Sequence, residues 1–291
     1  MNFGAHVSIS PGIELAPQNA QKLGCECFQI FSQSPRGGTR RLPTEEKIQQ
    51  FKTNLKKYNQ KTCYVHTPYF INLASKNNRI FYGSINAIKK DLEIAQLLQA
   101  KAVVTHLGSY KDFVNEKNKT LKNKTPLPEK AKALVLKGLN KILDSYSDQP
   151  MLLLEIAAGS GHIIGSSIQE LAFFIQEIAH PKLGFCFDTA HAFASGLDLR
   201  EKKQIQTAIQ KIKNQINLDK MPLIHLNDSK SKFNSKVDRH THLGEGEIGL
   251  SAIQELLRHK RLQNIDYILE TPSEQGVKKD LAWLKQERAK I

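Results

Sequence analysis

The 291-residue sequence has few cysteines and no arrangement of them that indicates a disulfide framework. None of the four stands in a Cys-x-x-Cys pair, which argues against a zinc ribbon and against a redox motif. All of them lie within apolar stretches, so we expect buried free thiols in a reducing compartment. These cysteines are Cys25, Cys27, Cys63 and Cys186.

The sequence also lacks long apolar runs. No stretch approaches the about 18 apolar residues that a membrane span needs. Residues 1–10 have neither the basic start nor the long apolar core of a signal peptide. We therefore expect a cytoplasmic protein with no membrane partner, and nothing in the sequence indicates an obligate protein partner.

Acidic residues are in deficit. The chain has 42 Lys and Arg against 28 Asp and Glu, a formal net charge of +14, while 40% hydrophobic and 24% charged residues are ordinary for a globular protein. The excess indicates a polyanionic partner such as nucleic acid. A lysine-rich surface without that partner is the alternative, because only nine of the basic residues are arginine.

Short apolar runs alternate with longer amphipathic stretches along the whole chain. Nearly continuous apolar runs such as Met151–Glu155 are typical of parallel strands that are buried on both faces. The predicted strands are Asn2–His6, Cys27–Ser32, Thr62–His66, Ala102–His106, Met151–Glu155, Gly184–Asp188, Leu223–Asn227 and Tyr267–Glu270. The predicted helices are Thr44–Tyr58, Ser84–Ala100, Glu129–Tyr146, Ser167–Ala179, Glu201–Ile216, Leu250–Leu257 and Val277–Arg288.

Eight such strands could form a closed barrel or an open doubly wound sheet. No Gly-x-Gly-x-x-Gly follows the first strand, which weakens the dinucleotide-binding version of the open sheet. We predict an α/β fold, a (β/α)₈ TIM barrel that forms a single domain over residues 1–291. Lys111–Lys130 is poorly patterned, and we interpret it as a solvated loop or helix start rather than a domain boundary.

Six successive strand candidates carry a metal-competent residue at their carboxyl ends, where a barrel of this kind has its active site. Burying an ionisable group at the end of an apolar strand is costly unless the group is paired or coordinated. One such residue is unremarkable, but six in order are difficult to explain as core residues. They are His66, His106, Glu155, Asp188, His225 and Glu270.

Two further clusters add donors. His191 follows Asp188 within one helical turn. In an extended segment Asp238, His240 and His242 would project to one side, although a solvated polar loop is an equally simple interpretation of that stretch.

Nitrogen and oxygen donors without thiolates suit zinc or manganese. Five imidazoles and four carboxylates are too many for one tetrahedral ion, and they suit a cluster of two or three ions with a bridging carboxylate. Closely spaced ions are typical of phosphoesterases. With the basic charge, the residues alone predict a metal-dependent phosphodiesterase that acts on nucleic acid.

Several separated motifs are spread over nearly the whole chain: Gly4–Ser8, Val65–Tyr69, Asp188–Phe193, His225–Lys230, Asp238–His240 continuing into Leu243–Gly246, and Leu269–Pro272. In these motifs the chain resembles the endonuclease IV family, the zinc-dependent AP endonuclease family 2. The resemblance implies a TIM barrel with a trinuclear metal site at the C-terminal ends of the strands. It also implies hydrolysis of the phosphodiester bond 5′ to an abasic site in double-stranded DNA by a metal-activated hydroxide, leaving 3′-hydroxyl and 5′-deoxyribose phosphate ends.

The resemblance also implies how the ligands divide among three Zn²⁺ ions, one of which Mn²⁺ could replace. One ion would take His66, His106 and Glu155. A second would share Glu155 and add Asp188, His225 and Glu270, and the third would take His191, Asp238 and His240, with His242 uncoordinated. Glu155 and Glu270 are the residues that we expect to act in catalysis.

For DNA binding the resemblance points to Arg36, Tyr69, Phe70, Asn227 and Lys230. Tyr69 and Phe70 would enter the base stack and Arg36 the gap. The chain departs from the family pattern at Leu107, Ile156 and Ala157, and where Gly37 and Gly38 follow Arg36. These departures leave the predicted ligand set complete. We expect them to affect the contacts with the lesion and the reaction rate rather than the type of reaction.

Two other functions are open. Glu155, Asp188, His225 and Glu270 alone could form the single-metal site of a sugar isomerase or epimerase on a related barrel, although that leaves the other imidazoles and the charge unexplained. A catalytically silent protein that binds DNA lesions is the second, but such a protein would usually have lost ligands. A monomer is the family expectation.

Overall fold

Eight parallel strands form a closed barrel in the computed structural model, which describes residues 1–35, 37, 41–114 and 126–291. The order around the barrel is β1, β10, β7, β6, β5, β4, β3, β2, and β1 pairs with both β10 and β2. The predicted TIM barrel is thereby confirmed, and the open sheet is excluded. The strands are β1 (Phe3–His6), β2 (Cys27–Phe31), β3 (Cys63–His66), β4 (Ala102–Thr105), β5 (Met151–Glu155), β6 (Leu183–Asp188), β7 (Leu223–His225) and β10 (Asp266–Leu269).

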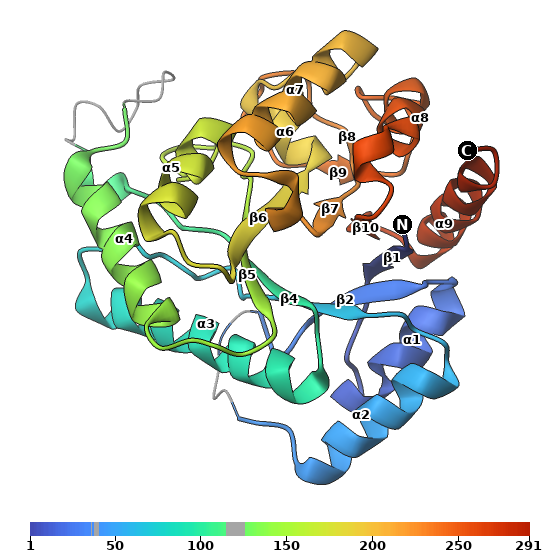
Figure 1. Ribbon diagram of the computed structural model, residues 1–291, viewed down its shortest axis with the longest axis horizontal. Coiled ribbons are helices and arrows are strands. Elements are labelled where there is room, and N and C mark those ends of the chain that lie inside the picture. The colour runs from blue at the N-terminus through green and yellow to red at the C-terminus, as the bar shows by residue number, and fades with distance from the viewer. Residues whose placement is uncertain (36, 38–40, 115–125) are drawn as a thin grey trace.

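Helices surround the barrel as an outer ring (Figure 1). Their apolar faces pack on the strands, and their ends carry the expected capping residues. Thr44 caps α2, Ser167 caps α5 and Ser273 caps α9, each by accepting a backbone N–H with its hydroxyl. The helices are α1 (Ala16–Leu23), α2 (Glu45–Lys57), α3 (Asn78–Leu98), α4 (Glu129–Leu143), α5 (Ile168–Ile178), α6 (Thr189–Ser195), α7 (Lys202–Gln215), α8 (Leu250–Arg258) and α9 (Glu274–Arg288).

Beyond shifts of one to three residues at other helix ends, three helices differ from the sequence prediction. Neither α1 nor α6 was predicted, because seven or eight residues give too short a periodic pattern. The predicted start of α3 at Ser84 was wrong: the helix begins at Asn78, and Asn77 is its cap. Ser84 instead lies inside the helix, where its hydroxyl donates to the Ile80 carbonyl over 2.7 Å.

The barrel interior is filled by side chains of alternate strand residues. Tyr64, Val104 and Leu153 belong to this inner cluster, whereas the intervening Val103 and Leu152 belong to the outer core that packs under the helices. At the N-terminal ends of the strands, the carboxylate of Asp266 joins side chains of three other segments. It accepts hydrogen bonds from Tyr64 Oη at 2.6 Å, Lys101 Nζ at 3.0 Å and Asn2 Nδ2 at 2.7 Å. The metal-competent side chains lie at the other end.

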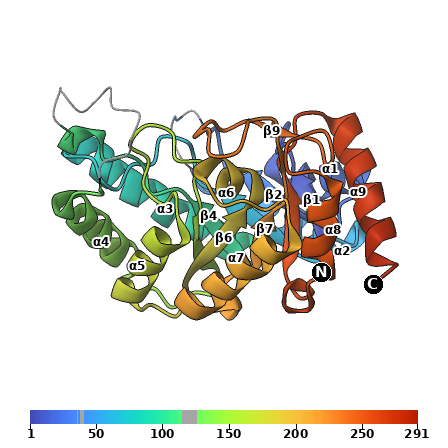
Figure 2. The ribbon, with the colours of Figure 1, turned by 90° about the horizontal axis from the view of Figure 1, so that it is seen from above.

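A two-stranded hairpin, β8 (Asp228–Ser229) and β9 (His240–Thr241), stands at the carboxyl ends of the barrel strands (Figure 2). The buried carboxylate of Asp228 accepts backbone N–H groups from Gly244, Gly246, Ile248 and Gly249 over 2.9–3.2 Å. This carboxylate ties the loop after β9 to the barrel and so holds His240 over its mouth.

All four cysteines are free and buried, as expected. Burial raises the pKa of Cys25 and of Cys63 to about 12, so these thiols stay protonated at neutral pH. Within the described part of the chain, no helix combines the length and apolar character that a membrane crossing requires.

Candidate metal centre

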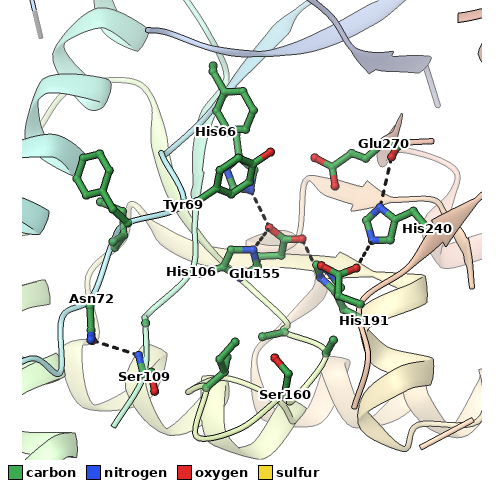
Figure 3. A pocket seen from close by; sticks show the side chains of 18 of the residues that line it. His66, Tyr69, Asn72, His106, Ser109, Glu155, Ser160, His191, His240 and Glu270 are labelled. Carbon is green, nitrogen blue, oxygen red and sulfur yellow. Dashed lines mark hydrogen bonds and ion pairs between the residues drawn. The ribbon is translucent and has the colours of Figure 1, made fainter. Parts of the chain in front are cut away.

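Seven of the nine predicted ligands line one cavity of about 660 Å³ at the carboxyl ends of the strands, and the other two, Asp188 and His225, are buried next to them. Glu155, at the end of β5, lies at the centre of the cluster, with His66 and His106 on one side and His191 on the other (Figure 3). Glu155 and Asp188 are almost completely buried, whereas the ends of Tyr69 and Phe70 are exposed at the rim. The cavity therefore joins a charged floor to an aromatic edge.

The first group of donors consists of His66, His106 and Glu155. Nε2 of His66 lies 3.0 Å and Nε2 of His106 lies 3.3 Å from Oε2 of Glu155. These three ligand atoms lie within 4.8 Å of one another, a spacing that one ion could bridge.

The second group consists of Glu155, Asp188, His225 and Glu270. Nδ1 of His225 lies 3.0 Å from Oε1 of Glu155, 3.3 Å from Oε2 of Glu270 and 3.9 Å from Oδ2 of Asp188. Glu155 thus belongs to both groups through different oxygens. That arrangement is the one expected of a bridging carboxylate.

The third group centres on His191 and His240. Oδ2 of Asp238 lies 3.2 Å from Nε2 of His191, and its Oδ1 lies 3.3 Å from Nε2 of His240. Asp188 also reaches this group, because its Oδ2 lies 3.6 Å from Nε2 of His240. His242 does not join it and bonds instead to Asp280 at 2.8 Å and Ser273 at 3.1 Å. The expectation from the residue pattern that His242 would project with Asp238 and His240 was therefore wrong.

Hydrogen bonds leave the inward nitrogens of these imidazoles available as ligands. Nδ1–H of His66 donates to the Thr67 carbonyl at 2.7 Å, and Nδ1–H of His191 donates to the Ile156 carbonyl at 3.0 Å. Nε2–H of His225 donates to Gln29 at 2.9 Å, which leaves Nδ1 facing the carboxylates. Metal-binding histidines are usually held in this way.

The electrostatics reflect a dense set of charges away from water. Burial lowers the pKa of His191 and of His225, but neighbouring groups outweigh it and hold both pKa values well above the ordinary one. Asp188 raises the pKa of His191. Cys186 and Glu270 raise the pKa of His225. For His106 burial outweighs the opposing effect of Glu155 and lowers its pKa to about 4. Burial raises the pKa of Glu155, but His106 and His225 lower it well below the ordinary value.

Two supporting residues were missed by the sequence analysis, His6 and Gln29. His6 lines the cavity and packs on Phe31 with ring centroids 4.4 Å apart. Gln29 is fully buried in β2 and contacts His6, His225 and Glu270. A glutamine inside the apolar run Cys27–Phe31 was the signal that could have identified it.

The predicted DNA-binding residues fall into three situations. Tyr69 and Phe70 are 72% and 42% exposed at the cavity rim, and Lys230 is exposed on the hairpin loop. Asn227 is 0% exposed: its Nδ2 donates to Asp188 and its Oδ1 accepts Glu270 N–H, both at 2.8 Å. A DNA contact does not fit that placement, because an amide covered on all sides cannot reach a phosphate. Arg36 lies outside the described residues, as does Gly38.

The three apolar departures from the family pattern lie close to the ligands. Leu107 and Ile156 are buried, and Ala157 lines the cavity. Ile156 supports His191 through its carbonyl, so the hydrophobic side chain does not remove that hydrogen bond. Gly37 has a φ of 109°, a conformation that glycine adopts without strain.

The residues present fit a cluster of divalent ions. Every group has nitrogen and oxygen donors only, and no thiolate is in any of them. Among the residues that the structure describes, the buried Nε2 of His240 has no hydrogen-bond partner, although Oδ1 of Asp238 lies 3.3 Å and Oδ2 of Asp188 lies 3.6 Å away. An ion between these atoms would satisfy it.

Known proteins resemble this chain over its whole length. A family model described as xylose isomerase-like TIM barrel matches residues 17–287. Proteins named "Probable endonuclease 4" from Halothermothrix orenii and Carboxydothermus hydrogenoformans are 35% and 34% identical; the matches cover 97% and 100% of this chain and 97% and 98% of the relatives. The crystal structure of endonuclease IV from Thermus thermophilus superposes with a TM-score of 0.85 at 28% identity over 100% of both chains. A D-tagatose 3-epimerase-like protein shares the fold, with a TM-score of 0.75 at 20% identity over 100% of this chain and 98% of the other.

Proposed function

Because the chain belongs to the endonuclease IV family of the xylose isomerase-like TIM barrels, we propose that it is a zinc-dependent DNA-repair endonuclease. It hydrolyses the phosphodiester bond 5′ to an abasic site and leaves a 3′-hydroxyl and a 5′-deoxyribose phosphate. The observation that carries this proposal is the contiguity of the three donor groups, which are linked by Glu155 and Asp188 and adjoin one cavity.

The chain's own residues hold the charge and geometry for this reaction. When bound, the divalent ions would stabilise negative charge on the phosphate and make water a better nucleophile near neutral pH. Glu155 would orient the attacking water between the first two groups, and Glu270 would face the same space from β10. Asn227, with one contact to each of Asp188 and Glu270, would keep two ligands in place.

The rim of the cavity is suited to a lesion that has no base. An abasic nucleotide is already unpaired, so moving it out of the duplex is cheaper than moving an intact one. Tyr69 and Phe70 present exposed rings beside the cavity and would fill the space in the base stack. Arg36 would contact the DNA at the lesion, a role that rests on the family resemblance alone.

The net charge supports a polyanionic substrate. If the nine predicted ligands bind three divalent ions, the positive charge of the ions exceeds the negative charge of the four ligand carboxylates. The rest of the chain keeps its excess of basic residues. Such a positive charge would attract a DNA backbone, and the affinity would fall with added salt.

A single-metal sugar epimerase is the competing function, supported by the shared fold and by the Glu155, Asp188, His225 and Glu270 group. The number of ions separates the two proposals. If elemental analysis finds about three metal ions per chain, the result supports the nuclease. If it finds about one, the result supports the epimerase.

The direct test is incubation with a duplex that carries one abasic analogue, with and without chelator. We expect one cut on the 5′ side of the lesion with a 3′-hydroxyl and a 5′-deoxyribose phosphate, and no cut after chelation. An intact duplex of the same sequence is the control. Cleavage that ignores the lesion, or ends of the opposite kind, would contradict the proposal.

A further inference from the structure

A buried glutamine joins three residues at the mouth of the barrel. Gln29 is 0% exposed on β2, yet its side chain reaches His225 at the end of β7, across the barrel mouth. Its Oε1 lies 2.9 Å from Nε2 of His225. Its Nε2 lies 2.7 Å from Oε1 of Glu270 and 3.1 Å from Nδ1 of His6. All the polar atoms of the amide are therefore engaged.

Only one orientation of this amide satisfies its neighbours. The carboxylate of Glu270 can only accept, so the amide must present N–H to it, and Oε1 must then face His225. A carbonyl oxygen requires a donor, so His225 carries a proton on Nε2. Nδ1 is left toward Glu155, Asp188 and Glu270, and it is the nitrogen that an ion would bind.

Gln29 differs from the groups that hold the other imidazoles. His66 and His191 donate to backbone carbonyls, which any residue at those positions would supply. For His225 the corresponding acceptor is a side chain, and the same side chain also donates to the ligand Glu270. One substitution would therefore alter two ligands of one donor group at once.

We propose that Gln29 is a positioning residue for the second donor group: it sets the tautomer of His225 and the orientation of Glu270, and so determines how firmly that group holds its ion. This inference rests on the proposed metal centre. Loss of such a supporting contact typically lowers metal affinity by about 10- to 100-fold.

The test compares Gln29→Met and Gln29→Glu with wild type, and Gln60→Met is the matched control. Gln60 is also a buried glutamine, but its Nε2 donates to the carbonyls of Cys25 and Tyr58 away from the donor groups. Each purified protein is loaded with Zn²⁺ and dialysed against a chelator series, and the zinc retained per chain is measured. Cleavage rates at rising Zn²⁺ are recorded in parallel.

We expect both Gln29 variants to release one zinc at about 10- to 100-fold lower chelator strength. Excess Zn²⁺ should restore much of the cleavage rate of Gln29→Met without changing KM for DNA, which a merely structural defect would not allow. Gln29→Glu keeps the size of the side chain and an oxygen that accepts from His225, but it cannot donate to Glu270. It therefore tests the role of Gln29 even if the methionine variant folds poorly. Gln60→Met should retain zinc like wild type.

The two possible failures are distinguishable. If wild type holds several zinc ions and the Gln29 variants hold them equally firmly, the role of Gln29 is refuted while the proposed function stands. If wild type itself holds no zinc, both are refuted. A loss that excess Zn²⁺ does not restore in either variant also refutes the positioning role.

Discussion

Nε2 of His66 lies 3.0 Å from Oε2 of Glu155, although 89 positions separate the two residues in the sequence. The barrel produces this contact because β3, β4 and β5 are consecutive neighbours and end at the same edge. The other oxygen of Glu155 faces His225 at 3.0 Å. One carboxylate therefore links two donor groups, and its removal should affect both.

Replacing Glu155 by Gln should lower the cleavage rate by about 10²- to 10³-fold or more, because an amide cannot bridge two cations as a carboxylate does. Steady-state cleavage of an abasic duplex and zinc content per chain measure the effect. Glu93→Gln, on an exposed surface pair with Lys90, is the control. Full activity of Glu155→Gln would contradict the bridging role.

Removing metal should destabilise the protein as well as inactivate it. Ligands that bind only the folded state add about 2.7 kcal/mol of stability at a concentration 100 times Kd. Without ions, the buried carboxylates and imidazoles of the centre would remain close together but would lack the positive charge of the metal. We expect chelation to lower the Tm and added Zn²⁺ to restore it, as measured by calorimetry; an unchanged Tm would show that the groups hold no ion.

Substituting the rim aromatics should weaken lesion binding without unfolding the protein. Tyr69→Ala and Phe70→Ala each remove an exposed ring, and a base–aromatic contact is worth about 1–3 kcal/mol, or roughly 5- to 150-fold in affinity. Binding to abasic and intact duplexes should be compared with Tyr82→Ala, a 42% exposed tyrosine on α3. Equal losses on both duplexes would argue against recognition of the lesion.

The pair of Glu26 and Arg288 should stabilise the fold in a pH-dependent way. Burial raises the pKa of Glu26, but two guanidinium hydrogen bonds of 2.7 and 2.8 Å outweigh it and lower the pKa below its ordinary value. A lowered carboxyl pKa contributes stability above the unfolded-state pKa of about 4.3, and this contribution is lost as pH falls through the folded-state value.

Arg288→Gln should therefore lower the free energy of unfolding by about 1 kcal/mol at pH 7. The difference from wild type should shrink as the pH falls from about 4.3 through the lowered pKa of Glu26 in the folded wild type, below which Glu26 is protonated in both proteins. Urea unfolding at several pH values measures it, with the exposed Arg79→Gln as control. A constant difference at all pH values would mean that the charge of Glu26 is not involved.

Lys230 offers a test of the electrostatic part of DNA binding. If its exposed ammonium contacts a phosphate, Lys230→Ala should reduce the slope of log affinity against log salt by about 1, with little change in lesion preference. Lys213, exposed in the last turn of α7, is the control. An unchanged slope would remove Lys230 from the interface.

Much of the barrel was predictable because its strands are short, buried on both faces and bounded by polar residues. All eight predicted barrel strands are present, and the residues at their carboxyl ends do meet in space. That convergence follows from parallel topology, since the ends of parallel strands share an edge. The gathering of these donor side chains could therefore be predicted without knowing any distance.

The supporting contacts could not be predicted in the same way. Gln29 reaches His225 across the barrel mouth, and no local pattern in β2 or β7 indicates that pairing. Asn227 was predicted to bind DNA on the resemblance alone, yet it lies between β7 and β8 in the chain and is completely buried. The contacts of Gln29 and of Asn227 with the predicted ligands depend on the positions that distant strands take around the barrel.

The position of the last strand ties the closure of the barrel to the completion of the second donor group. The strand β10 pairs with β1 on one side and with β7 on the other, and Glu270 follows directly after it. The same strand that closes the ring between the two ends of the chain's strand order therefore also delivers Glu270 to His225. A truncation before β10 would remove both the closure of the barrel and one predicted ligand.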